Sequence, residues 1–283
     1  MKTYIVAVSG GIDSVVLLDL LSKQSDICLI VAHFDHGIRF DSALDAVFVN
    51  NLAINYGLKF ESKRKELGIN ASEDLARKYR YKFLKDLADK YKASIVTAHH
   101  ADDIIETIAI NIKRGTGWRG VAVLDSSIVR PLLSYFKSDI VSYADSHNLI
   151  WREDPTNISK KYLRNRIRLD LNNKLNDNDK KRIINIWKLQ CDLKHKIDQE
   201  IKISICKNNS YSRDLLIYMD DLLAEEYLRA FIMHESQQSP TRKQVKRALL
   251  AIKTAKPASR HDVGDGVVLL FSLTDFIVEL RQN

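Results

Sequence analysis

Residues 7–14 read AVSGGIDS and lie between the apolar segment Tyr4-Ile5-Val6 and the leucine-rich segment VVLLDLL. This order predicts a buried strand that passes through a short loop into a helix. The beginning of a helix presents unpaired N–H groups and a partial positive charge, and both suit a phosphate group. The two glycines let the backbone approach an anion without a Cβ clash, and the two serines add hydroxyl donors. The residues of this predicted phosphate site are Ser9, Gly10, Gly11, Ile12, Asp13 and Ser14.

Two better-known phosphate loops do not fit this stretch. A Walker A loop requires GxxxxGK(S/T), and a dinucleotide fingerprint requires GxGxxG. The plain alternative is a tight turn. A bare SGG turn is common, however, whereas SGGxDS directly between a buried strand and an apolar helix is much rarer, which favours a phosphate site. Asp13 is also placed to hold a divalent metal ion beside the phosphates.

The bulk composition is that of a globular protein with a moderate basic excess. Of 283 residues, 45% are hydrophobic and 28% charged, and 44 basic residues against 36 acidic ones give a net charge of +8. This excess is compatible with a polyanionic partner. No apolar run approaches the roughly eighteen residues that span a bilayer, and the N-terminus lacks a signal-peptide pattern. Cys28, Cys191 and Cys206 are far apart, so we expect neither disulfides nor a metal cluster, and a cytoplasmic protein.

Strands and helices alternate in the first half of the chain. The predicted strands are Tyr4–Val8, Ile27–Phe34, Leu58–Glu61 and Ser94–Ala98, and the predicted helices are Asp13–Ser22, Ser42–Tyr56, Asn70–Tyr91 (with Asn70 as N-cap) and Ile104–Lys113. This alternation predicts an α/β fold in which helices cover both faces of a parallel sheet. Ligands bind such sheets beyond the carboxyl ends of the strands, where Ser9, Asp35 and His99 fall.

The second half changes character after about residue 165. Leu169–Ile205 is long, lysine-rich and helical in period, and Val245–Ile252 is a further predicted helix. Short strands are predicted at Gly264–Leu270 and Phe276–Leu280. We therefore expect two domains: a catalytic domain over residues 1–168, and a smaller, mostly helical domain over residues 169–283 that ends in a small β element.

The loop at residues 7–14 resembles the PP-loop of the ATP pyrophosphatases. The other stretches that match a family pattern are AHFDHGIRFDS (32–42), ARKYRY (76–81), TAHHADDIIETIAINIKRGTGWRG (97–120), IVRPLL (128–133) and WREDPTNISKKYLRNRIR (151–168). Together they resemble the tRNA(Ile)-lysidine synthase family, over about the first 168 residues. The resemblance implies a Rossmann-like, adenine nucleotide alpha hydrolase-like catalytic domain, with ATP and Mg²⁺ as cofactors. It also implies that the second domain, residues 169–283, binds tRNA.

The resemblance also implies a reaction. ATP adenylates the C2 oxygen of the wobble cytidine in the CAU anticodon of tRNA(Ile) and releases pyrophosphate. The ε-amine of free lysine then attacks C2 and expels AMP, which changes the codon read from AUG to AUA and the tRNA identity from Met to Ile. A homodimer is a further expectation at the level of the family.

The segment HHADDIIET supplies candidate residues for binding or deprotonating lysine. Asp102 and Glu106 are four residues apart and share one face of the predicted helix. His99 lies where the preceding strand ends, and Asp103 lies beside Asp102. Carboxylates suit the ammonium of lysine, although capping of the helix by either aspartate is the structural alternative. The sequence leaves open which acid takes which role.

Cationic segments supply the remaining candidates. Arg114, followed by a glycine-rich turn, could stabilise charge on the leaving pyrophosphate, or it could simply close a helix. His36 and Arg39 are nucleotide contacts or part of a solvated loop. The residues predicted to bind tRNA are Arg77, Arg80, Asp154, Asn157, Arg164, Asn165 and Arg168. For the first two, the exposed face of an ordinary helix is an equal alternative.

Two other functions fit parts of the pattern. A tRNA thiolase also adenylates a base, but thiolases of the cytidine type carry paired cysteines or a cluster. A module that binds ATP or RNA without turnover belongs to a different class. Turnover that depends on lysine separates all three.

Overall fold

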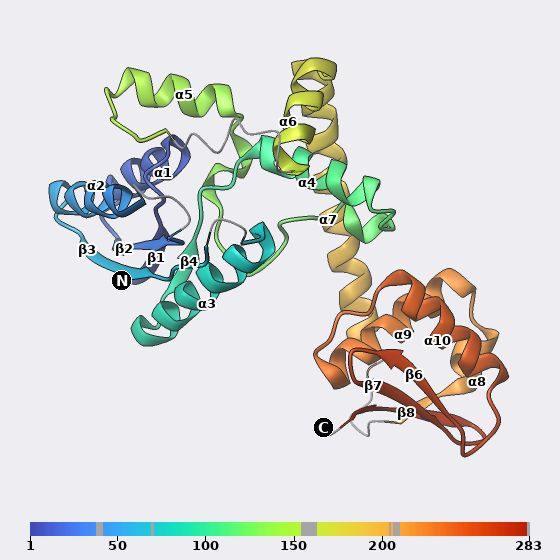
Figure 1. Ribbon diagram of the computed structural model, residues 1–283. Helices are drawn as coiled ribbons and strands as arrows, with labels where there is room; N and C mark the ends of the chain where they lie inside the picture. The colour runs from blue at the N-terminus through green and yellow to red at the C-terminus, as the bar shows by residue number, and fades with distance from the viewer. Residues whose placement is uncertain (38–41, 69–70, 154–162, 204, 206–209, 282–283) are drawn as a thin grey trace. The chain divides into compact units, whose positions relative to one another are not determined.

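The computed structural model describes residues 1–283 except 38–41, 69–70, 154–162, 204, 206–209 and 282–283 (Figure 1). Its contacts divide the chain into two compact units. The first unit comprises Met1–Lys113 and Val123–Ile186, and the second comprises Arg114–Ala122 and Trp187–Asn283. The division thus falls after residue 186, whereas the sequence placed a boundary after residue 168, and the segment that follows Lys113 joins the second unit.

The first unit is built on a parallel sheet of four strands in the order β3-β2-β1-β4. The strands are β1 (Lys2–Ala7), β2 (Ile27–Asp35), β3 (Lys59–Arg64) and β4 (Ser94–Val96). Tyr4 of β1 pairs with Leu29 of β2 on one side and with Ser94 of β4 on the other. The predicted parallel α/β sheet is therefore confirmed.

Helices cover both faces of this sheet because successive side chains of each strand point to opposite faces. The helices of the first unit are α1 (Ile12–Ser22), α2 (Ser42–Asn55), α3 (Glu73–Tyr91), α4 (Ala101–Lys113), α5 (Lys137–Ser146) and α6 (Leu163–Lys174). Val6 belongs to the core cluster formed with α1, α2 and α5. Its neighbour Ile5 belongs to the cluster formed with α3, on the opposite face (Figure 1).

The beginning of α3 differs from the prediction. Ser72 is the N-cap, and its hydroxyl accepts a hydrogen bond from Leu75 N at 3.2 Å. The helix begins at Glu73, so the predicted start at Asn70 is wrong, and Asn70 itself lies outside the described residues. Serine is as good an N-cap as asparagine, and the sequence-based prediction overlooked Ser72, two residues after Asn70.

The predicted helix Leu169–Ile205 is divided into two. α6 ends at Lys174, and α7 (Asp177–Ile203) begins after a break in which Asn176 and Asp179 cap each other. The first ten residues of α7 belong to the first unit and the rest to the second.

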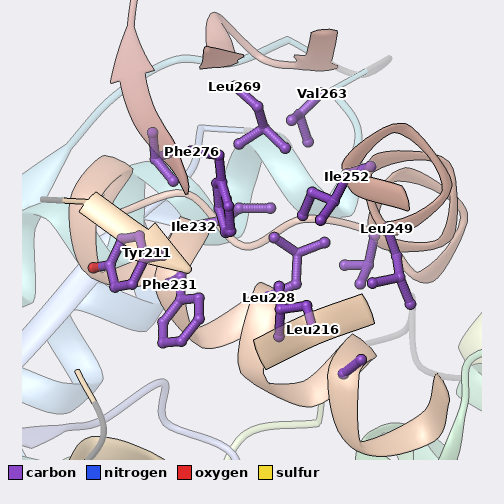
Figure 2. Close-up of a cluster of buried hydrophobic side chains, with 14 of the residues drawn as sticks. Tyr211, Leu216, Leu228, Phe231, Ile232, Leu249, Ile252, Val263, Leu269 and Phe276 are labelled. Carbon is purple, nitrogen blue, oxygen red and sulfur yellow. The ribbon is translucent and has the colours of Figure 1, made fainter. Parts of the chain in front are cut away.

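The second unit packs three helices against an antiparallel sheet. The helices are α8 (Arg213–Tyr218), α9 (Asp221–Ser236) and α10 (Arg242–Thr254). The strands β5 (Ser210–Ser212), β6 (Arg260–Gly264), β7 (Val267–Phe271) and β8 (Asp275–Leu280) pair in the order β5-β8-β7-β6. Figure 2 shows the core between helices and sheet, where Phe231 of α9 stacks on Tyr211 with ring centroids 4.0 Å apart. The β element is thus larger than predicted, because β5 and β6 were missed.

Candidate active site

The loop between β1 and α1 is shaped by its own serines and glycines. The hydroxyl of Ser14 accepts a hydrogen bond from Ser9 N at 3.2 Å and donates one to Gly11 O at 2.8 Å. Gly10 has φ +93°, in the region that favours glycine. Gly11 is the N-cap of α1, and no side chain caps this helix. The N–H groups of its first turn therefore lack a side-chain acceptor, as in helix N-termini that bind anions.

A pocket of about 430 Å³ opens at the carboxyl ends of β1, β2 and β4. This volume lies within the usual range for small-molecule sites. The residues in its lining that the sequence predicted as site residues are Ser9, Asp13, Ser14, His36, Arg80, His99 and Asp103. The structure thus brings the loop, the end of β2, α3 and α4 to one pocket at the edge expected for a parallel sheet.

Two buried polar atoms in the pocket wall fit a ligand that forms hydrogen bonds. Neither His36 Nδ1 nor Ser42 Oγ has a hydrogen-bond partner among the described residues. The neighbouring carboxylate of Asp35, by contrast, accepts a hydrogen bond from Gly37 N at 2.8 Å. Buried polar groups are nearly always paired, so these two atoms fit the ring nitrogens and hydroxyls of a nucleotide.

His100 lies at the beginning of α4 among three carboxylates. Its Nε2 is 3.5 Å from Asp103 Oδ2 and 3.9 Å from Asp13 Oδ1, and its Nδ1 is 3.6 Å from Asp102 Oδ2. The ring is buried. It therefore joins the phosphate-binding loop to α4. The sequence favoured His99, which instead forms a 2.8 Å hydrogen bond with Thr97 Oγ1 and lines the pocket.

We call four acids of this region the carboxylate cluster: Asp13, Asp102, Asp103 and Glu106. Cations from other segments of the first unit pair with all four. The pairs are Lys137 Nζ to Asp13 Oδ1 (2.5 Å), Lys180 Nζ to Asp102 Oδ1 (2.9 Å), Arg164 Nη2 to Asp103 Oδ1 (2.7 Å), Arg164 Nε to Glu106 Oε2 (2.7 Å) and Arg168 Nε to Glu106 Oε1 (2.5 Å). A substrate ammonium would therefore compete with the chain's own cations at each acid.

The surroundings favour the charged forms of Asp102, Asp103 and His100. Burial disfavours the charged form of Asp102, but the nearby His100 ring and the hydrogen bond from Lys180 outweigh burial and hold its pKa well below the usual value. Burial likewise opposes the charge of Asp103, and the charges of His100 and Arg164 lower its pKa overall. For His100, burial is outweighed by the nearby carboxylates of Asp102 and Asp103, so its pKa is raised.

Two other histidines of the pocket have depressed pKa values. Burial lowers the pKa of His36 to about 4, helped by the charge of Arg80, and burial lowers the pKa of His99 to about 4 against the pull of Asp103. Both rings are therefore neutral at pH 7. Protonating either ring costs more free energy in the folded protein than in the unfolded chain.

These shifts predict that the stability of the first unit is highest near pH 6.5. Below this pH, the unfolded chain binds protons at His36 and His99 while the folded chain does not, so stability falls as the pH drops toward about 4. Above it, the stabilisation from His100 is lost as the pH rises through its raised pKa. Urea unfolding at pH 4.5, 6.5 and 8.5 measures this. A His99→Gln variant should flatten the acid side, and an unchanged acid limb would contradict the assignment.

The two predicted RNA-binding arginines of α3 lie next to one aromatic ring. The guanidinium carbons of Arg77 and Arg80 are 4.8 and 5.6 Å from the ring centroid of Tyr81. Arg80 and Tyr81 both line the pocket. This placement does not decide whether Arg77 and Arg80 bind RNA or form the exposed face of an ordinary helix. Because Arg80 lines the pocket, it is also a candidate nucleotide contact.

Two of the predicted RNA-binding residues of α6 form ion pairs with acids of α4. Arg164 and Arg168 are one helical turn apart and donate to acids of α4. Asn165 is half-buried on the same helix. Both guanidinium groups are thus paired with carboxylates of the first unit. Arg39, Asp154 and Asn157 lie outside the described residues.

Arg114 belongs to the second unit. It is exposed immediately after α4, and Gly115 follows with φ +71°, as at many helix ends. The glycine after Arg114 fits the helix-closing alternative, and the role of Arg114 toward the leaving pyrophosphate stays a prediction.

Lys137 and Lys180 were missed as site residues. The backbone N–H of Lys137 also donates to Asp102 Oδ2 at 2.8 Å, so α5 is anchored to the carboxylate cluster at its first residue. No local pattern marks either lysine, because their partners lie 124 and 78 positions away in sequence. Only the excess of acids around residues 102–106 signalled that cations had to come from elsewhere.

Taken together, the parallel sheet, the uncapped helix after a glycine loop and the pocket at the strand ends define a nucleotide-binding domain of the PP-loop type. The chain belongs to the PP-loop domain family, which it matches over residues 1–175. Membership implies ATP binding. Among the described residues no helix is long and apolar enough to cross a membrane.

The chain is also similar to curated proteins named tRNA(Ile)-lysidine synthase. It is 33% identical to the one from Thermosipho africanus over 69% of this chain and 51% of that protein, and 33% identical to the one from Thermotoga maritima over 76% of this chain and 56% of that protein. The resemblance predicted from the sequence is thereby confirmed. The chain spans about half the length of these relatives.

A solved structure supports the fold. A U34-tRNA thiolase from Methanococcus maripaludis, solved with its 4Fe-4S cluster, matches with a TM-score of 0.55 and 18% identity over 68% of this chain and 72% of that chain. At this identity the likeness concerns the fold alone.

Proposed function

We propose that this protein ligates free L-lysine to C2 of the wobble cytidine in tRNA(Ile) with a CAU anticodon. The base is first adenylated by ATP with release of pyrophosphate, and lysine then displaces AMP. Since tRNA, ATP and lysine meet in the cytoplasm, we place the protein there. A homodimer is part of the proposal only as an expectation from the family.

One observation carries the proposal: the phosphate-binding loop and the carboxylate cluster share one edge of the sheet. Asp13 of the loop lies 3.9 Å from His100, which also approaches Asp102 and Asp103. A reaction that first needs a bound triphosphate and then a bound ammonium requires such neighbouring sites of opposite charge. Adenylation and aminolysis can then occur at one base without its release.

The loop and Lys137 suit the triphosphate. The N–H groups at the beginning of α1 and the glycine backbone donate hydrogen bonds to phosphate oxygens. Lys137 supplies the cation that a Walker loop would carry within its own motif. Both stabilise the charge that develops on the leaving pyrophosphate.

Asp13 fits Mg²⁺. Among the described residues no three His, Cys, Asp or Glu side chains form a metal site. Magnesium in nucleotide sites, however, is usually held by one or two carboxylates together with phosphate oxygens. Asp13 lines the pocket and is one-third exposed, so its carboxylate is open to that role, and a bound Mg²⁺ would neutralise phosphate charge.

The acids of α4 suit the lysine substrate. A carboxylate accepts hydrogen bonds from an ammonium, and a neighbouring carboxylate can take the proton that the amine must lose before it attacks. Lys180 presents the same primary ammonium to Asp102 at 2.9 Å. We therefore infer that Asp102 is a position where the substrate ammonium replaces that of Lys180.

Replacing Lys180 with Met should lower the KM for lysine several-fold. The change keeps the apolar stem of the side chain and removes the competing charge from Asp102. The turnover number should change little. Lysine-dependent AMP release at saturating ATP and tRNA measures both constants, with Lys174→Met on α6 as a control of equal charge change. A raised KM would instead make Lys180 part of the lysine site.

Mass analysis of the anticodon nucleosides after incubation with ATP, lysine and tRNA tests the proposed reaction. Lysidine should form only when all three are present. Product formed with sulfide but not lysine would favour the thiolase alternative. ATP binding without any release of pyrophosphate would favour a non-catalytic binding module.

A further inference from the structure

Two helices of the second unit, α9 and α10, carry charges of mostly opposite sign. The chain contains no aspartate or glutamate from Gln237 to His261, a stretch that includes the whole of α10. The first two turns of α10 hold four cations, which we call the basic surface: Arg242, Lys243, Lys246 and Arg247. The neighbouring helix α9 carries four acids, namely Asp221, Glu225, Glu226 and Glu235, and one arginine, Arg229.

The basic surface faces solvent because the opposite face of α10 is buried. Figure 2 shows Leu249 and Ile252 of α10 in the core close to Leu228 of α9. The buried residues recur at the helical spacing: Val245, Ala248, Leu249 and Ile252. With 3.6 residues per turn, Lys243 and Arg247 then lie opposite this buried stripe, and both are exposed.

Most of the positive charge of the basic surface is not neutralised by carboxylates of the described residues. Arg242 and Lys246 share a single carboxylate, Glu225, at 4.0 and 3.7 Å. No carboxylate pairs with Lys243 or Arg247 within the part of the chain that the structure describes. Four cations therefore face one acid.

Two neighbouring features extend this picture. Burial, helped by the charge of Arg247, lowers the pKa of His261 on β6, so this ring adds no charge to the basic surface at pH 7. The side chain of Arg242 lies against Gly117, in the segment that follows Arg114. The RGTG motif thus borders the basic surface within the second unit.

We propose that the basic surface binds the phosphodiester backbone of the tRNA. This inference rests on the proposed function, which requires a tRNA partner. Lys243 and Arg247 are one turn apart, about 6 Å along the axis, and cations so placed neutralise phosphates without reading bases. A membrane-binding helix would need an exposed apolar face, whereas that of α10 is in the core.

The double variant Lys243→Gln/Arg247→Gln tests the inference. Binding of fluorescent tRNA by the full-length protein should weaken at least tenfold, and the slope of log affinity against log salt should fall by about two. The KM for tRNA should rise while the KM values for ATP and lysine stay unchanged. The matched control Lys188→Gln/Lys196→Gln removes the same charge from exposed positions of α7 in the same unit, and should leave tRNA binding nearly unchanged.

Several results would overturn the inference. Equal losses in the two double variants would mean that net charge matters and this surface does not. Loss of binding to phosphatidylserine vesicles with unchanged tRNA affinity would indicate a membrane instead. If the wild type forms lysidine and the variant keeps its tRNA affinity, only this inference fails; if the wild type binds no tRNA, the proposed function fails. Should the double variant melt early, each single variant should still lower the salt slope by about one.

Discussion

Gly10→Val is expected to reduce adenylation by at least about 100-fold, the typical loss when a backbone donor to a developing anion is displaced. Gly10 has φ +93°, and a Cβ there would lie 3.3 Å from Phe48 Cδ1 and 3.5 Å from Val49 Cγ2. Valine is strained at this φ, and either the Phe48 side chain or the loop must move, so we expect the loop N–H groups to lose their aim at the phosphates. Pyrophosphate release in a single turnover with tRNA and ATP measures the loss.

Gly57→Val is the matched control for backbone strain. Gly57 has φ +64° in the turn after α2, but nothing lies within 4 Å of a Cβ built there. Both variants pay about 1–3 kcal/mol for a β-branched residue in the left-handed region. Only Gly10→Val should lose activity beyond its loss of stability. A Gly10→Val enzyme that retains full adenylation would return residues 7–14 to the status of a plain turn.

Local sequence was sufficient for most of the first unit. Strand residues such as Ile5 and Val6 are apolar without interruption, which is typical of a strand buried on both faces, and long helical periods separate the strands. The ends of elements were less predictable. Ser72 and Asn70 are both good cap residues, so the sequence alone does not decide between them, and Ser72 is the cap in the structure.

The candidate site was only half predictable. Side chains in the loop and at the strand ends could be placed together because parallel strands end at one edge. Their partners could not, because Lys137 and Lys180 reach the acids from segments distant in sequence. Arg164 and Arg168 illustrate the same limit: a basic run predicts a polyanionic partner, yet both guanidinium groups donate to carboxylates of the same unit.

Glu106→Gln is expected to destabilise the first unit by about 3 kcal/mol, the lower end of the range for breaking a buried ion pair. The side chain of Glu106 is 3% exposed and accepts from Arg164 and Arg168 at 2.7 and 2.5 Å. Loss of its charge leaves two guanidinium groups facing an amide, although Arg168 keeps 38% of its side chain in solvent and so limits the cost. The Tm should fall by roughly 6–12 °C.

A double-mutant cycle separates this structural role from lysine binding. If Glu106 mainly serves the two arginines, its replacement should cost much less stability in an Arg168→Met background, because one of the charges it satisfies is already gone. The KM for lysine should then change little. Glu66→Gln, on an exposed acid that pairs with Arg64 at 3.2 Å, should leave stability within about 0.5 kcal/mol. A large rise in the KM for lysine with an unchanged Tm would instead make Glu106 a substrate ligand, with the arginines as its holders in the free protein.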